Sequence, residues 1–120
     1  MDAIYEAVLD RFRKPIEREI VSVHRSDSAG VASTFPDEHF DWVYIDGNHL
    51  FEFVERDLDI FWPKVRRNGV LAGDDYGSEG WWDDGVKRAV DQFVASQLCH
   101  VMSLGDQFAL RRPELDSEAG

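Results

Sequence analysis

The sequence has little cysteine, and Cys99 is its only one. An intrachain disulfide is therefore excluded, and such sparing use of cysteine is typical of a reducing compartment. Cys99 lies in an apolar run with Leu98, Val101 and Met102. We therefore interpret it as a buried structural thiol rather than a nucleophile.

Basic residues are also scarce, with 13 Lys and Arg against 24 Asp and Glu and a net charge of −11. This balance argues against nucleic acid or an anionic membrane as a partner. No apolar run reaches the length of a membrane span, and the amphipathic N-terminus carries mixed charge, unlike a signal peptide. We expect a cytoplasmic protein with no nucleic-acid or membrane partner.

Internal repeats and low-complexity tracts are absent, and 120 residues suit one domain. Apolar periodicity and turn residues predict alternating helices and strands. The expected helices are Ala3–Arg13, a short one with its N-cap within residues 26–28 that runs through Val31 and Ala32 to about Phe35, Leu50–Trp62, and one that includes Val86 and Phe93. The expected strands are Glu19–His24, Phe40–Ile45, Val70–Gly73, Cys99–Leu104 and Gln107–Arg111.

This alternation predicts an α/β fold with a mostly parallel sheet. Gly105-Asp106 between the last two strands predicts an antiparallel hairpin at the C-terminal end. Residues 1–112 form the predicted domain, and the polar residues 113–120 form a predicted flexible tail.

Acidic residues follow three of the expected strands. Asp27 comes after the first, Asp46 after the second, and Asp74 with Asp75 after the third. The carboxyl ends of parallel strands meet at one edge of a sheet, and facing carboxylates repel unless a cation lies between them. Oxygen ligands of this kind suit Mg²⁺, Ca²⁺ or Mn²⁺. The alternative is structural, because Asp after a strand often caps the next helix or turn.

The segment Phe40–Phe93 resembles the class I S-adenosylmethionine-dependent methyltransferases of the small-molecule O-methyltransferase group. The matching pieces are an apolar strand leading into IDG-x-H, a helix with an internal D-L, and a W-x-P turn before G-V. A G-D-D-Y strand end and a final G-V-K-R-A-V-D-x-F helix complete the pattern. Each piece is weak alone, but their order and spacing are specific.

The resemblance implies methyl transfer from S-adenosylmethionine to a small-molecule hydroxyl, assisted by Mg²⁺ in metal-dependent members. The positions matching the metal ligands are Asp46, Asp74 and Asp75, and the position of the base matches His49. Imidazole suits proton abstraction near neutral pH. The adenine-contacting loop of the family matches Asp27, with Ser26 and Ser28 alongside, and Asp46 is included among the cofactor-binding positions.

The family pattern also contains a first strand with a glycine-rich loop and a second strand ending in an acid. No G-x-G pattern occurs in this chain, and nothing before Ile20 supplies either strand. We therefore expect a truncated Rossmann-like methyltransferase sheet that is partial or inactive as an isolated chain. The alternative is a non-catalytic remnant that serves as an oligomerisation or binding module. Missing strands leave exposed sheet edges, which predict a homo-oligomer.

Overall fold

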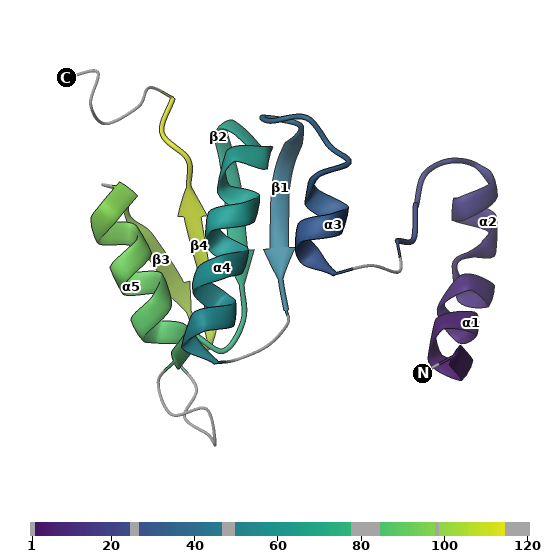
Figure 1. Cartoon of the computed structure of the whole chain (residues 1–120), viewed down its shortest axis with the longest axis horizontal. Helices are drawn as coiled ribbons and strands as arrows, with labels where there is room; N and C mark the ends of the chain where they lie inside the picture. Colours follow the sequence, from purple (N-terminus) through teal and green to yellow (C-terminus); the bar gives the residue numbers. More distant parts are fainter. Residues whose placement is uncertain (1, 25–26, 47–49, 78–84, 98, 115–120) are drawn as a thin grey trace.

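The computed structural model describes residues 2–24, 27–46, 50–77, 85–97 and 99–114. These residues form a four-stranded mixed sheet in the order β1-β2-β4-β3 (Figure 1). The strands are β1 (Phe40–Ile45), β2 (Val65–Gly73), β3 (Val101–Leu104) and β4 (Gln107–Arg111). The predicted α/β class and the closing antiparallel hairpin are confirmed.

The parallel pair β1 and β2 forms the part of the sheet that carries the acidic strand ends. Helix α4 (Phe51–Phe61) and the 3₁₀ turn η1 (Trp62–Lys64) connect the two strands, and Ile45 pairs with Gly73 at their carboxyl ends. The strand β2 begins five residues before the predicted Val70. Asn68, with φ 65°, lies at an irregularity within β2.

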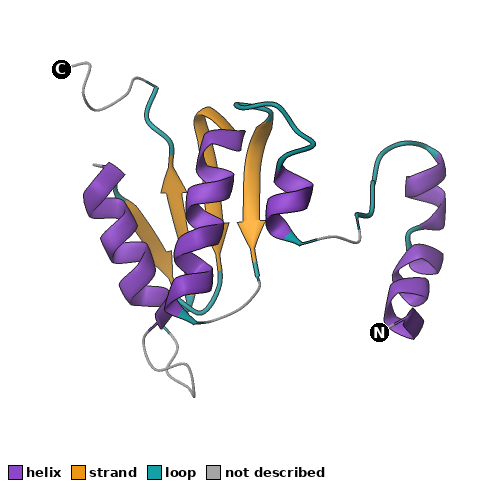
Figure 2. Cartoon of the chain, in the orientation of Figure 1, coloured by secondary structure: helices purple, strands orange, loops and turns teal. Residues whose placement is uncertain are grey.

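The remaining helices are α1 (Asp2–Arg11), α2 (Arg13–Glu17), α3 (Ser28–Ala32) and α5 (Gly85–Gln97). Helices α4 and α5 cover the same face of the sheet (Figure 2). The core between them and the sheet contains Leu58 of α4, Val90 of α5, and Leu71 and Leu110 of the strands, all fully buried. Cys99 is buried at the edge of this core, as predicted, and burial raises the pKa of its thiol.

The opposite face of the sheet is open among the described residues. Trp42 is 65% exposed and Leu104 is 85% exposed, and Tyr44 and Met102 are exposed beside them. The sequence of β1, FDWVYI, carries apolar residues on both faces, a pattern that suits a strand covered on both sides. Only its Val43 and Ile45 side packs against the core.

The first helices lie away from the sheet (Figure 1). The single helix predicted at Ala3–Arg13 is divided near Phe12, and Pro15 lies inside α2. Proline is tolerated there because N–H groups in the first turn of a helix lack an intrahelical acceptor.

The strand predicted at Glu19–His24 is not formed, and residues 21–24 have no regular secondary structure. A Rossmann sheet has the strand order 3-2-1-4-5-6, so a third strand pairs only with the second. The described residues include no such second strand, so the segment has no neighbouring strand among them to pair with. No helix in the described part of the chain is long and apolar enough to cross a membrane.

Candidate active site at the carboxyl ends of β1 and β2

Three carboxylates meet where the parallel strands end. Asp46 directly follows β1, and Asp74 and Asp75 directly follow β2. One carboxylate oxygen from each residue lies within 4.8 Å of the other two. The structure therefore brings together the three residues predicted as metal ligands.

The turn that follows β2 carries two of the three clustered carboxylates, those of Asp74 and Asp75. The Asp74 carboxylate accepts a hydrogen bond from the backbone N–H of Asp75 at 2.8 Å, and Asp75 has φ 65°. A left-handed backbone costs a non-glycine residue about 1 kcal/mol or more, and such strain is common at functional sites. Gly73 lets this turn begin close to its neighbours, because an added Cβ would lie 2.6 Å from ring carbons of Phe108.

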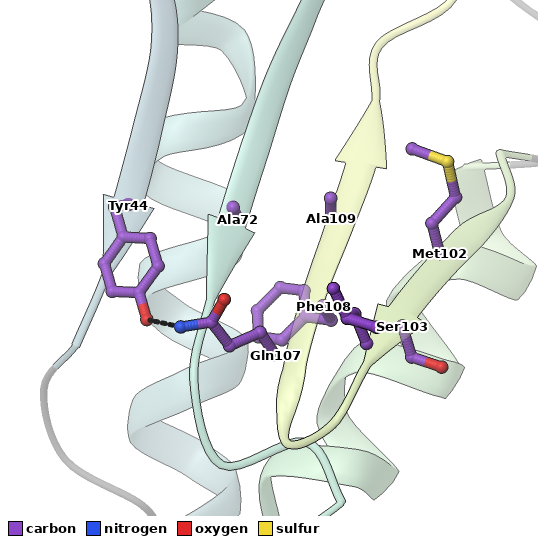
Figure 3. Close-up of a pocket in the computed structure, with 8 residues that line it drawn as sticks. Tyr44, Ala72, Met102, Ser103, Gln107, Phe108 and Ala109 are labelled. Carbon is purple, nitrogen blue, oxygen red and sulfur yellow. Dashed lines mark hydrogen bonds between the residues drawn. The ribbon is translucent and has the colours of Figure 1, made fainter.

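Tyr44 stands beside the acidic cluster. Partial loss of hydration raises the pKa of its phenol, and the carboxylates of Asp74 and Asp46 raise the pKa further. Its oxygen accepts a hydrogen bond from the Gln107 amide at 3.2 Å (Figure 3). Tyr44 therefore stays neutral at physiological pH and offers a hydroxyl donor next to the three acids.

The loop after Asp75 is fixed at two points by Tyr76. Its backbone N–H donates to the carbonyl of Asp106 at 2.7 Å, and its hydroxyl donates to the Asp91 carboxylate of α5 at 2.5 Å. Lys87 donates to the other oxygen of Asp91 at 2.7 Å. These bonds hold the acid pair between α5 and the β3–β4 hairpin.

A cavity of about 230 Å³ lies between α3, β1 and α4. Ser28 and Asp46, two of the residues predicted to bind the cofactor, line it. Asp27, which was also predicted to bind the cofactor, is the N-cap of α3, and its carboxylate accepts the N–H of Gly30 at 2.8 Å. Ser26 and the predicted base His49 lie outside the described residues.

A second hollow, of about 200 Å³, lies on the open face of the sheet (Figure 3). Tyr44, Met102 and Phe108 contribute to its mostly apolar lining. Sequence reasoning missed Tyr44 and Gln107 as site residues. The period of two in β1 was the available signal, since it separates Trp42 and Tyr44 from the core-facing Val43 and Ile45.

The donor set of the cluster fits a hard divalent cation. It consists of carboxylate oxygens only, and Asp46 is exposed while Asp74 and Asp75 are half-buried. Mg²⁺ is usually held by one or two carboxylates and keeps several waters, which this partly open arrangement permits.

Comparison with known proteins agrees with the architecture. A family model described as "Methyltransferase domain" matches residues 3–76. A crystal structure of a protein from Corynebacterium glutamicum superposes with a TM-score of 0.66 at 20% sequence identity, over 92% of this chain. The chain spans 59% of the length of that protein. No curated protein matches the sequence significantly.

Proposed function

Because the chain belongs to the methyltransferase domain family, we propose that it takes part in methyl transfer from S-adenosylmethionine to a small-molecule hydroxyl. The observation that carries this proposal is the convergence of Asp46, Asp74 and Asp75 at the paired ends of β1 and β2. In open α/β sheets, ligands bind outside these strand ends.

The three carboxylates are the residues that would hold Mg²⁺. A bound divalent ion would supply Lewis-acid chemistry and lower the pKa of the acceptor hydroxyl. His49, three residues after Asp46, is the proposed base that receives the hydroxyl proton. Tyr44 can donate a hydrogen bond to the acceptor because its phenol stays neutral. The apolar hollow beside Tyr44 suits an aromatic or aliphatic part of the acceptor.

S-adenosylmethionine would supply the methyl group as a sulfonium. The cavity lined by Ser28 and Asp46 is the proposed binding site for part of this cofactor. The chain has no G-x-G pattern to cradle the methionine end. We therefore expect binding through the remaining contacts to be weak and turnover by the isolated chain to be slow.

Binding of Mn²⁺, followed by electron paramagnetic resonance, tests the acidic cluster. We expect one Mn²⁺ site in the wild-type chain and a loss of affinity of about tenfold or more in Asp74→Asn, because a carboxylate ligand is removed. Asp106→Asn is the matched control, since it removes an exposed acid from the neighbouring turn with the same change in net charge. Equal affinities in the two variants would contradict the assignment.

The open face and free edge of the sheet favour a second candidate function. Strand β1 pairs only with β2 among the described strands, so its other edge presents unpaired backbone groups. A second copy of the chain can pair with this edge through two-fold symmetry. In that case the fold serves as an oligomerisation module.

A further inference from the structure

The arm formed by α1 and α2 carries an apolar stripe. Ile4, Val8 and Phe12 recur every four residues, and a hydrogen bond from the Phe12 N–H to the Val8 carbonyl continues the helical geometry past the end of α1. Side chains at this spacing lie on one side of a helix. Ile4 is 68% exposed and Phe12 is 40% exposed, so the arm presents an apolar surface to solvent.

The open face of the sheet is a second apolar surface, and its size matches the arm. Trp42 and Tyr44 of β1 and Met102 and Leu104 of β3 are exposed on the two outer strands. Because neighbouring strands lie about 4.8 Å apart, the outer strands of the sheet are separated by about 14 Å. Helix α1 has 10 residues and is therefore about 15 Å long. It can cross all four strands, and a helix packed on a sheet is a standard layered arrangement.

The arm extends away from its own sheet (Figure 1). Near its base, the ring of His24 packs edge-on against Phe35, with ring centroids 5.6 Å apart. Ser28 of the following helix α3 lines the same cavity as the core-facing Val43, so α3 lies on the side of the sheet opposite the open face. To cover its own open face, the arm would have to turn around the free edge of β1. An extended arm reaches a second copy without that turn.

The charges of the arm complement those beside the open face. Residues 11–18 carry four basic side chains and one acidic one, in a chain whose net charge is −11. None of these four bases forms an ion pair within the described part of the chain. Asp46 and Asp74 lie near Tyr44 at one end of the open face, where their charges act on its phenol. Opposite charges on two surfaces favour their association and offset the repulsion between acidic copies.

We propose that the arm of one copy lies across the open sheet face of a second copy, with its apolar stripe against the side chains exposed on β1 and β3. The inference rests on the second candidate function, association of two copies, and identifies the surfaces that meet. The hollow of about 200 Å³ beside Tyr44 lies on this face. Small-molecule sites enclose most of the ligand surface, so the partner's arm would complete the site proposed for the acceptor.

The experiment mixes two forms of the full chain and detects contacts between copies by NMR. One form is Glu6→Cys with a nitroxide on the new cysteine, and the other is isotope-labelled wild type, so that only a neighbouring copy can weaken the observed amide signals. Glu6 is exposed on α1, and its replacement keeps the apolar stripe intact. We expect the amide signals of Tyr44, Met102 and Ala109 to be lost.

Phe53→Cys with the same nitroxide is the matched control. Phe53 is exposed on α4, which covers the other face of the sheet, so this label should leave the three signals unchanged. Wild type treated with the same reagent verifies that the buried Cys99 stays unmodified. Unchanged signals with the Glu6 label, or equal losses with both labels, would overturn the proposal.

A second sample distinguishes a second copy from the arm's own sheet. Isotope-labelled, nitroxide-carrying Glu6→Cys diluted into an excess of unlabelled wild type reports contacts within one chain. Loss of the open-face signals in this sample, together with intact signals in the mixed sample, would place the arm on its own sheet and overturn the proposal.

Phe12→Ser tests the apolar stripe through the dimer dissociation constant, measured by sedimentation velocity. We expect an increase of about tenfold or more, because a large apolar side chain no longer becomes buried on association. Phe53→Ser should leave the constant unchanged, and so would Phe12→Ser if the arm made no contact. Dimerisation without signal loss in the mixed sample refutes only the arm contact and leaves pairing through β1. A monomeric wild-type chain refutes the second candidate function itself.

Discussion

The carboxylate of Asp91 joins the loop that follows the acid pair to helix α5. It accepts hydrogen bonds from the Tyr76 hydroxyl and the Lys87 ammonium. Burial works to raise its pKa, but the hydrogen bonds from Lys87 and Tyr76 outweigh that effect and lower the pKa. Burial and the Asp91 hydrogen bond raise the pKa of Tyr76, and the Asp91 hydrogen bond raises that of Lys87.

The directions of these pKa shifts determine the pH range in which the Asp91 contacts stabilise the fold. A lowered carboxyl pKa contributes stability above the unfolded value of 3.8, and the contribution is lost as pH falls through the folded pKa. The raised pKa of Tyr76 contributes stability below its unfolded value of 10.0, and this is lost as pH rises through the folded pKa.

Asp91→Asn should lower the free energy of unfolding at pH 7 by about 1 kcal/mol, because the contacts are charge-assisted but partly exposed. Urea unfolding at several pH values measures this. The difference from wild type should shrink as pH falls below about 4, where unfolded Asp is protonated. A difference that persists unchanged at pH 2.5 would contradict the role given to the charge of Asp91.

Gly73 sets the close approach at the end of β2. An added Cβ would lie 2.6 Å from Phe108 ring carbons and 2.9 Å from the carbonyl oxygen of Ile45. Gly73→Ala should therefore destabilise the fold by about 1–3 kcal/mol in urea unfolding. Gly77→Ala is the control, since its nearest contact would be 3.2 Å. Equal effects of the two substitutions would show that crowding at Gly73 is not the cause.

The acids were predictable at the residue scale, whereas their polar neighbours were not. Asp46, Asp74 and Asp75 could be placed together because they follow strands that were expected to be parallel. The carboxyl ends of such strands meet at one edge of the sheet. Gln107 contacts Tyr44 across 63 positions of sequence, which no local pattern encodes.

At the scale of single elements, α3 depends on its cap. The helix has only five residues, so most of its stability must come from its cap and its packing. The structure shows Asp27 as the N-cap, while the family resemblance assigns its loop to adenine contact. Capping and adenine contact would use the same carboxylate. A substitution would lower stability in the first case and cofactor affinity in the second.

Asp27→Ala should lower the free energy of unfolding by about 1 kcal/mol, and Asp27→Asn should lower it much less because an amide oxygen still accepts from Gly30. Thermal unfolding of both variants checks this. Equal losses in both variants would contradict the capping role. A loss of cofactor affinity in Asp27→Asn, without a loss of stability, would instead identify a contact to the ligand.

Elements with a partner in the sheet were predictable, and the element without one was not. Strands β1, β3 and β4 and helices α4 and α5 form close to where periodicity placed them. Glu19–His24 has the composition of a strand, but composition supplies no neighbour for its backbone groups. Composition likewise did not predict that Trp42 is exposed, because an apolar strand is buried on both faces only where other elements cover both.

At the scale of the whole molecule, the chain is less compact than a typical domain with the same number of residues. Its radius of gyration is 15.6 Å, against about 14 Å for a compact domain of this size. The arm formed by α1 and α2 lies away from the sheet (Figure 1), and its Ile4 and Phe12 are exposed. Apolar side chains exposed on both the arm and the open sheet face favour association.

We predict a dimer in sedimentation velocity at tens of micromolar protein, formed by pairing of the free edge of β1 with a second copy. Trp42→Ser should shift the chain to monomer because it removes a large exposed apolar side chain from that strand. Phe53→Ser is the control, since Phe53 is an exposed aromatic residue on α4. A monomeric wild-type chain, or equal shifts in both variants, would contradict association through β1.

The most direct test of the methyltransferase assignment is calorimetric titration of the full chain with S-adenosylmethionine, with and without Mg²⁺. The account predicts weak but saturable binding, weakened further by Asp46→Asn because Asp46 lines the cofactor cavity and belongs to the acidic cluster. Absence of binding under both conditions would contradict it. The family membership would then describe the descent of this chain and not its activity.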